Sequence, residues 1–293
     1  MTLDLLADAD GAAARAAKAA GVVVREVAAL DELEAVTALF DEIWESDTGN
    51  PSVRVDLLRA MTKAGNYATG AYDLVSGELL GACFGFFGPP PQAELHSHIA
   101  GVVPAGRGRS VGFALKVHQR AWALRHGARA IAWTYDPLIR RNAYFNLVKL
   151  GARPAEYLRN FYGLMDDVIN GGTETDRMLV RWDLESVLAS EASAGRPRPA
   201  SFDSERSRGA IVALSAGPGD LPARPVVGGP GSRAFLVGVP SDIEAMRLAD
   251  PALAAQWRTA LRDVLSPLLS GGARVTGFDR NGWYVVSTER NEK

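Results

Sequence analysis

The sequence predicts an α/β (α+β) protein. Strand-like and helical runs alternate from residue 22 to residue 183. Within this part, residues 95–115 pass from an apolar strand through a glycine-rich turn into a helix. After a stretch of weak periodicity, a strand, a helix and two further strands follow residue 232. These patterns indicate one large sheet domain and a smaller carboxyl-terminal α/β half-domain.

Composition narrows the class of protein. The chain has 293 residues, of which 47% are hydrophobic, enough to bury a sizeable core. Its formal net charge of -2 gives no electrostatic reason to expect nucleic acid as a partner. The single cysteine, Cys83, excludes an internal disulfide, and four histidines make a structural zinc site a poor expectation. Because no long apolar run or basic leader is seen, we expect a cytoplasmic protein without a membrane partner.

The elements follow in order along the chain. Residues 1–20 are rich in alanine and poor in large apolar side chains, so we expect a weakly packed helical appendage there. Residues 21–186 form the sheet domain, because β-rich runs alternate in it with apolar residues at helical spacing. The expected strands are 22–27, 68–74, 79–87, 95–103, 130–135, 153–163 and 177–183, and the expected helices are 30–44, 53–63, 113–126 and a helix from about Asn142 to its cap Gly151.

The carboxyl-terminal third divides into two parts. Residues 187–232 are rich in Ala, Gly, Pro, Ser and Arg, which predicts a linker or a loosely packed excursion. Residues 233–293 form a half-domain with a strand at 235–240, a helix at 251–269 and a hairpin of 273–279 with 283–288. This half-domain has no glycine-rich loop, and the acidic residues of 241–244 would repel a phosphate.

The turn that follows strand 95–103 predicts an anion site. It reads Pro-Ala-Gly-Arg-Gly-Arg-Ser-Val-Gly from Pro104 to Gly112 and opens a helix. Backbone N–H groups at such a helix start converge on one point, and Arg107 and Arg109 add charge. The P-loop ending Gly-Lys-Ser/Thr is absent, and the glycine spacing does not fit the dinucleotide fingerprint. The turn therefore predicts a cradle for a pyrophosphate.

This turn resembles the acyl-CoA loop of the GNAT acetyltransferase superfamily, Arg/Gln-x-x-Gly-x-Gly/Ala. Two registers fit the sequence. In the first, Arg107 leads, Ser110 replaces the middle glycine and Gly112 is last. In the second, Arg109, Gly112 and Ala114 match literally, but the loop is two residues longer. We prefer the first, because serine is small and its N–H can still face a phosphate.

A second signature supports the same resemblance. GNAT enzymes often carry an Asn, then a helix with Tyr-x-Lys-x-Gly-Phe, and this chain has Asn142 followed by Leu-Val-Lys-Leu-Gly-Ala at 147–152. The arrangement looks most like a branch known only as predicted GNAT acetyltransferases, some relatives of which are associated with N-succinylamino acid metabolism. The resemblance implies a GNAT fold, with a mixed central sheet that splays beside the fourth strand and admits pantetheine like an added strand.

The resemblance also implies a function. It indicates an N-acyltransferase that moves an acetyl or succinyl group from acyl-CoA, its co-substrate, to the amine of a small molecule such as an amino acid. A homodimer is the candidate assembly, and no metal is implied. The alternative is a non-enzymatic acyl-CoA-binding or regulatory protein on the same fold. The implied CoA-binding residues are Val102, Val103, Arg107, Gly108, Arg109, Ser110, Val111, Gly112, Asn142 and Asn146.

The general acid of many GNAT enzymes is missing here. Their tyrosine, which protonates the departing thiolate, would fall at position 147, where this chain has a leucine. Tyr144, Asn146 or a water could take that role, or the thiolate could leave unassisted, since it is a good leaving group.

A candidate base lies on the strand that precedes the cradle. Glu94, His96, His98 and Ala100 alternate there, so their side chains are expected on one face. Histidine is suited to deprotonate an amine near neutral pH, and we favour His96 over His98, with Glu94 acting through water as the reserve. The alternative is that both histidines are scaffold residues.

Overall fold

The computed structural model describes residues 3–45, 51–163, 174–224 and 233–288. Contacts divide the chain into two compact units. Unit 1 comprises Met1–Trp133 with Trp182–Arg196, and unit 2 comprises Thr134–Arg181 with Pro197–Lys293. This division differs from the sequence-based boundaries at residues 20, 186 and 232, which remain predictions, and each unit is described by itself.

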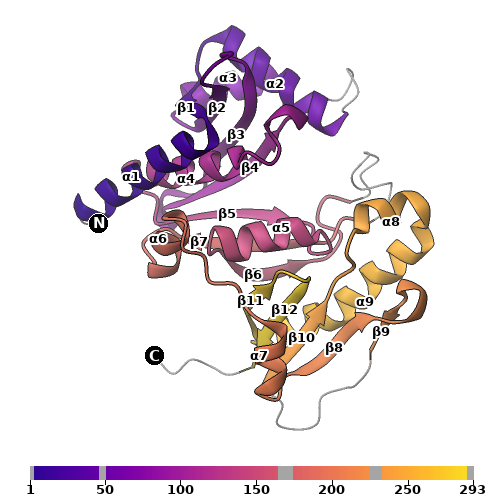
Figure 1. The fold of residues 1–293 in the computed structure, drawn as a ribbon. Helices are drawn as coiled ribbons and strands as arrows, with labels where there is room; N and C mark the ends of the chain where they lie inside the picture. Colours follow the sequence, from indigo (N-terminus) through magenta and orange to yellow (C-terminus); the bar gives the residue numbers. More distant parts are fainter. Residues whose placement is uncertain (1–2, 46–50, 164–173, 225–232, 289–293) are drawn as a thin grey trace. The chain divides into compact units, whose positions relative to one another are not determined.

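The strands form two sheets. One has seven strands in the order β1-β2-β3-β4-β5-β7-β6, and the other has five in the order β11-β12-β10-β8-β9 (Figure 1). The first is mixed, because β4 and β5 run parallel whereas β1 to β4 are joined as antiparallel neighbours. The order of strands and helices along residues 22–183 confirms the predicted α/β class.

In unit 1, helices cover both faces of the antiparallel strands. A Cβ added at Gly101 of β4 would meet Ile43 and Trp44 of α2, whereas one at Gly81 of β3 would meet Leu115 of α4. Gly101 and Gly81 are therefore on opposite faces, one under α2 and the other under α4. The elements of this unit are α1 (Leu3–Ala20), β1 (Val22–Glu26), α2 (Leu30–Trp44), α3 (Val55–Lys63), β2 (Tyr67–Asp73), β3 (Leu79–Phe87), a 3-10 turn (Pro90–Gln92), β4 (Glu94–Val102), a second 3-10 turn (Pro104–Gly106), α4 (Val111–Arg125), the start of β5 (Ala130–Tyr135) and α6 (Val187–Ser193).

Helix α1 packs along α4 through its alanines (Figure 1). The buried residues of α1 are all alanines: Ala9, Ala12, Ala13, Ala16 and Ala20. Their small side chains allow the two helix backbones to approach closely. The expected appendage thus has one continuous face against the sheet domain, although it buries little area per residue.

Unit 2 is built around the second sheet and the long helix α9. Trp257 and Leu261 of α9 and Tyr284 of β12 are fully buried. The elements of this unit are α5 (Arg140–Tyr144), a π-helical turn (Phe145–Lys149), β6 (Arg153–Leu158), β7 (Arg177–Asp183, which continues into unit 1), α7 (Phe202–Ser207), β8 (Ile211–Ala216), a 3-10 turn (Pro218–Asp220), β9 (Pro222–Ala223), β10 (Ala234–Gly238), α8 (Ile243–Ala249), α9 (Pro251–Ser270), β11 (Arg274–Asp279) and β12 (Trp283–Ser287).

The stretch expected as a linker has more structure than the sequence suggested. Strand β8 pairs in parallel with β10 and antiparallel with β9, and Leu214 of β8 is fully buried. Residues 225–232 of this stretch lie outside the described residues. Ala210 to Leu214 was its one apolar run in the sequence, and this run forms β8. The predicted strand, long helix and hairpin after residue 232 are observed as β10, α9, β11 and β12, but a further helix, α8, lies between β10 and α9 where no helix was predicted.

A buried ion pair links the end of β5 to α9 within unit 2. Asp136 accepts two hydrogen bonds from Arg258, at 2.8 and 2.7 Å, and a further one from Arg247. The Leu138 N–H donates to the same carboxylate at 3.0 Å. Burial alone would raise the pKa of Asp136, but the Arg258 charge and these hydrogen bonds outweigh it and hold the pKa well below its usual range.

We therefore expect Asp136→Asn to lower the free energy of unfolding at pH 7 by about 3 kcal/mol, because it leaves the Arg258 charge buried without its carboxylate. Urea unfolding measures this difference. It should shrink as pH falls below about 4, since the depressed folded-state pKa stabilises only the ionised form. The control is Asp263→Asn, which breaks a half-exposed pair with Arg224 and should cost under about 0.5 kcal/mol. Equal losses in the two variants would contradict the prediction.

Candidate functional site

Strand β4 loses its parallel partner partway along its length. It pairs with β5 at Glu94–Ala130, Leu95–Ile131 and His96–Ala132. From Ser97 to Val102, the described structure pairs β4 with β3 alone. We call the end of pairing at His96 and Ala132 the fork. Beyond it, the outer backbone groups of β4 are not engaged by β5 and can bind an extended ligand.

A β-bulge follows the fork directly. On β3, Phe84 pairs with Ile99 and the next residue, Gly85, pairs with Ser97, so His98 is the extra residue on β4. His98 and Ile99 thus both oppose Phe84. A bulge bends its strand and increases the local twist, which turns β4 away from a straight continuation beside β5. Because of this extra residue, Ala100 pairs with Cys83 of β3. Its side chain therefore lies on the face of the sheet opposite to the one expected.

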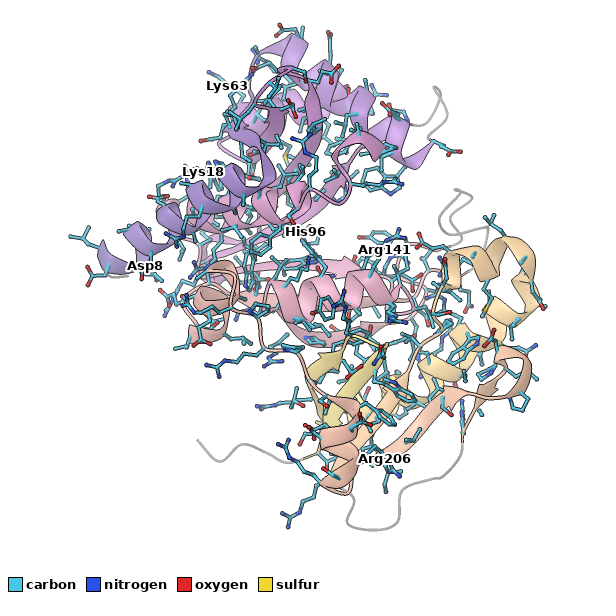
Figure 2. All side chains as sticks on the ribbon, viewed as in Figure 1. Asp8, Lys18, Lys63, His96, Arg141 and Arg206 are labelled. Carbon is cyan, nitrogen blue, oxygen red and sulfur yellow. The ribbon has the colours of Figure 1, made fainter. Side chains whose placement is uncertain are left out.

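The two histidines share one face of β4. Their ring centroids are 6.2 Å apart, and both rings pack on Phe86 of β3, at 5.1 Å for His96 and 5.8 Å for His98. Figure 2 labels His96 on its strand. His96 is half-buried and His98 is exposed, and Glu94 lies on the same face two residues earlier. This grouping is the one expected from the alternation of 94, 96 and 98, without Ala100.

The pKa values of both histidines are lowered from the ordinary value of 6.5, which favours the neutral imidazole at pH 7. Burial lowers the pKa of His96, and the charges of His98 and Lys116 lower it further, against an opposing effect of Glu94. Burial also lowers the pKa of His98. A neutral imidazole has a free nitrogen lone pair, so each ring can accept a proton from a substrate.

The predicted phosphate cradle, residues 104–112, is a turn that opens α4. The helix begins at Val111, two residues earlier than expected, after Gly108 with φ 79° and Ser110 with φ 65°. These left-handed residues reverse the chain between the 3-10 turn and the helix. The hydrogen bond from the Ala114 N–H to the Ser110 carbonyl is the first of the helix. The N–H groups of the first turn therefore have no acceptor within the helix and can bind an anion.

The two arginines of the cradle have different partners. Arg109 forms an ion pair with Asp73 at 2.7 Å and also donates to the carbonyls of Ala20 and Gly21. Hydrogen bonds from Ser76 N–H and the Arg109 guanidinium, with a further bond from Val75 N–H, lower the pKa of Asp73 to about 2. Arg107 is exposed, and its side chain has no partner among the described residues. Arg107 is thus the arginine available to a phosphate, which favours the register in which it leads.

Val102 and Val103, the two valines expected to bind CoA, differ in the direction of their backbone N–H groups. The Val103 N–H donates to the Leu80 carbonyl of β3 at 3.0 Å, so it is not available to a ligand. Because N–H directions alternate along a strand, the Val102 N–H points to the outer edge of β4. Val102 is the remaining candidate donor at this end of the strand.

The other expected site residues belong to unit 2. Asn142 and Tyr144 lie in α5 and are half-buried, and Asn146 and Leu147 lie buried in the π-helical turn. Leu147 is 3% exposed. In a π turn the backbone hydrogen bonds join residues five apart instead of four. Such turns often occur at functional sites. The sequence predicted a helix here, but its spacing gave no sign of the π turn.

Sequence reasoning missed one ionisable residue close to the fork. Lys116 of α4 is 4% exposed, and its ammonium donates to Ser97 of β4. The sequence feature that could have indicated its burial is its position between the apolar residues Leu115 and Val117. The helix that contains them is buried on most sides.

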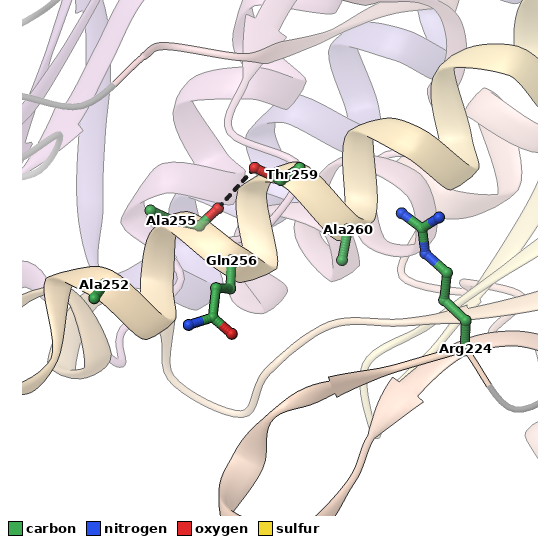
Figure 3. A pocket seen from close by; sticks show the side chains of 6 residues that line it. All are labelled: Arg224, Ala252, Ala255, Gln256, Thr259 and Ala260. Atoms are coloured by element: carbon green, nitrogen blue, oxygen red, sulfur yellow. Dashed lines mark hydrogen bonds between the residues drawn. The ribbon is translucent and has the colours of Figure 1, made fainter.

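A pocket of about 360 Å³ lies elsewhere, on α9 of unit 2 (Figure 3). It is lined by Arg224, Ala252, Ala255, Gln256, Thr259 and Ala260 and holds none of the expected site residues. In the described ranges, no group of three or more His, Cys, Asp or Glu side chains is arranged to hold a metal. No described helix combines the length and apolar character needed to cross a membrane.

No protein-family model and no curated protein matches the sequence. Solved structures are similar to it in fold. An N-acetyltransferase from Staphylococcus aureus Mu50 is 17% identical, with a TM-score of 0.47, over 56% of this chain and 99% of that one. A putative acetyltransferase from Salmonella typhimurium, solved with acetyl-CoA, is 14% identical, with a TM-score of 0.46, over 58% and 98%.

A third similar structure is a GNAT superfamily phosphinothricin acetyltransferase from Sinorhizobium meliloti in complex with acetyl-CoA. It is 14% identical, with a TM-score of 0.46, over 55% of this chain and 87% of that one. The three likenesses each span little more than half of this chain. The fold itself is defined by the strand order, the parallel β4–β5 pair and the fork.

We expect Gly112→Asp to abolish CoA binding, because it brings a negative charge to the cradle. The fold should survive, since a Cβ at Gly112 meets only Val102, at 3.6 Å. Arg107→Ala should weaken CoA binding by about 1 to 3 kcal/mol through loss of a charge-assisted hydrogen bond. Calorimetry measures both effects. Gly112→Ala, which adds the methyl without the charge, is the control, and unchanged CoA affinity in a folded Gly112→Asp protein would remove the cradle from the binding site.

Proposed function

We propose that this protein is an acyl-CoA-dependent N-acyltransferase that moves an acetyl or succinyl group to the amine of a small molecule. One observation carries the proposal: the outer edge of β4 beyond the fork runs directly into the cradle, with Arg107 unengaged beside it. An extended pantetheine arm would pair with that edge, while its pyrophosphate meets the N–H groups that open α4. An amino acid is the proposed acceptor, on the strength of the sequence resemblance.

The proposed base is His96. A neutral imidazole accepts a proton from the acceptor's ammonium group, and the freed amine attacks the thioester carbonyl. A tetrahedral oxyanion forms, for which the outward N–H of Val102 is the candidate donor. The attacking nitrogen then releases its second proton to water, the carbon–sulfur bond breaks, and the products are the amide and the CoA thiolate. His98 and Glu94 share the face of His96 and are the alternative bases, with Glu94 acting through water.

In this proposal, the CoA thiolate does not receive its proton from residue 147, the position of the tyrosine in many GNAT enzymes. Leu147 has no proton to donate, and Tyr144 or Asn146 enters as a candidate through the resemblance alone. A thiolate needs little assistance, because its conjugate thiol has a pKa of about 8.5. Acid assistance typically contributes about 10² to 10⁴ in rate, so its loss slows transfer without preventing it.

A second candidate function is non-enzymatic acyl-CoA binding with a regulatory role. The buried Leu147 in the place of the family's tyrosine favours it. The two candidates share the cradle and the fork and differ in chemistry.

A direct assay separates the two candidates. The full chain is incubated with acetyl-CoA or succinyl-CoA and a panel of amines that includes amino acids, and free thiol is followed. Cys83 is buried and adds little background. Amine-dependent thiol release that is absent in Gly112→Asp supports the enzyme. Binding of acyl-CoA without release for any amine supports the regulatory role, and absence of binding rejects both.

The histidines generate a prediction about pH. The double variant His96→Ala with His98→Ala should lose at least about 10² in kcat/KM, the usual contribution of a general base. In the wild type, kcat/KM should rise with pH through an apparent pKa below 6.5, because the pKa values of both rings are lowered from that value. Initial rates between pH 5 and 9 measure both effects.

The matched control for this prediction is His126→Ala. It removes an imidazole that stacks on Trp122 at the end of α4, away from the β4 face. If the double variant keeps its rate within about threefold of wild type across the range, the histidines are scaffold. Catalysis would then depend on holding a free amine beside the thioester.

A further inference from the structure

Lys116 has an unusual set of partners for a buried ammonium group. Its Nζ donates to the Ser97 hydroxyl at 2.9 Å and to the Gln119 side-chain carbonyl at 2.6 Å. It also lies 3.9 Å from the centre of the Trp133 ring. The three partners are neutral, and in the described part of the chain no carboxylate pairs with this lysine.

The partners of Lys116 mark a specific place in the sheet. The last β4–β5 pair is His96 with Ala132, so Ser97 and Trp133 are the first residues beyond the fork on each strand. Lys116 contacts one side chain from each. If pairing continued by one step, Ser97 and Trp133 would become direct neighbours. In the structure these two side chains are instead bridged by the Lys116 ammonium group, which contacts both.

The charge on Lys116 destabilises the folded protein. Burial lowers the pKa of Lys116 to about 8, a shift that only a Cys83 thiolate would oppose. Burial in turn raises the pKa of Cys83, so its thiol is neutral and supplies no counter-charge. The Lys116 charge also lowers the pKa of His96 of β4, which favours the neutral form of that ring. A methionine could fill a similar volume without this cost.

We propose that Lys116 is a positioning residue for acyl-CoA, which keeps the fork open by standing between Ser97 and Trp133. This inference rests on the proposed function, because it assigns the open edge of β4 to the pantetheine arm. Removing the ammonium group lets the β4–β5 pairing extend beyond His96, which consumes backbone groups that the ligand needs. Holding the edge free in advance lowers the cost of ordering it at binding.

The experiment compares Lys116→Met with Arg120→Met. Arg120 is a buried cation on the same helix, but it donates to the Leu184 carbonyl and to Ser190, away from the fork. Amide hydrogen exchange of residues 97–102 is measured on the full chain without ligand. We expect exchange to slow at least fivefold in Lys116→Met, because the outer N–H groups gain β5 acceptors, and to stay unchanged or rise in Arg120→Met.

Calorimetry with acetyl-CoA is the second measurement. The dissociation constant should rise at least tenfold in Lys116→Met and less than threefold in Arg120→Met.

Unchanged exchange in Lys116→Met overturns the inference whatever happens to affinity. Slowed exchange with unchanged affinity overturns the role in acyl-CoA binding. Slowed exchange in a protein whose wild type does not bind acetyl-CoA rejects the proposed function instead, while the action of Lys116 on the fork stands. Should Lys116→Met fail to fold, Ser97→Ala keeps the charge and removes one of its two strand contacts, and the same exchange criterion applies to it.

Discussion

The end of β4–β5 pairing at His96 and Ala132 is the constraint on which the candidate site depends. A strand that stayed paired on both edges would have no backbone groups to offer a ligand. Here the bulge at His98 follows the last pair directly, so the strand turns where its partner is lost. The same bulge places His98 beside His96 on one face, and the freed strand leads into the turn that opens α4.

Much of the fold could be predicted from the sequence, because its signals are local. Helix 30–44 and strand 130–135 have the bounds expected from apolar spacing and β-propensity. The start of α4 was misplaced by two residues, since Ser110 adopts a left-handed conformation that its residue type seldom takes. The stretch 187–232 was underestimated because β9 is two residues long and β8 depends on β10 for its pairing.

The candidate site was predictable in its residue types and less so in its geometry. The alternation of 94, 96 and 98 is a local property and is observed, but Ala100 changes face because of a bulge that the sequence does not encode locally. Arg107 and Arg109 look equivalent in the sequence. Only the fold brings Asp73 to Arg109 and leaves Arg107 exposed. Likewise, nothing near Lys116 in the chain indicates that Ser97 and Trp133 meet it.

A buried cation in unit 2, Arg258, has a carboxylate partner, whereas a buried cation near the fork in unit 1, Lys116, has neutral partners. In unit 2, Arg258 is neutralised by a bidentate contact with Asp136, so its charge stabilises one arrangement. In unit 1, Lys116 has only a hydroxyl, an amide and an aromatic ring. Its pKa falls from 10.5 to about 8 on folding, so unfolded chains bind more protons in that window and stability rises with pH across it. In the proposed role of Lys116, this charge, which weakens the fold at neutral pH, keeps β4 and β5 apart at the fork.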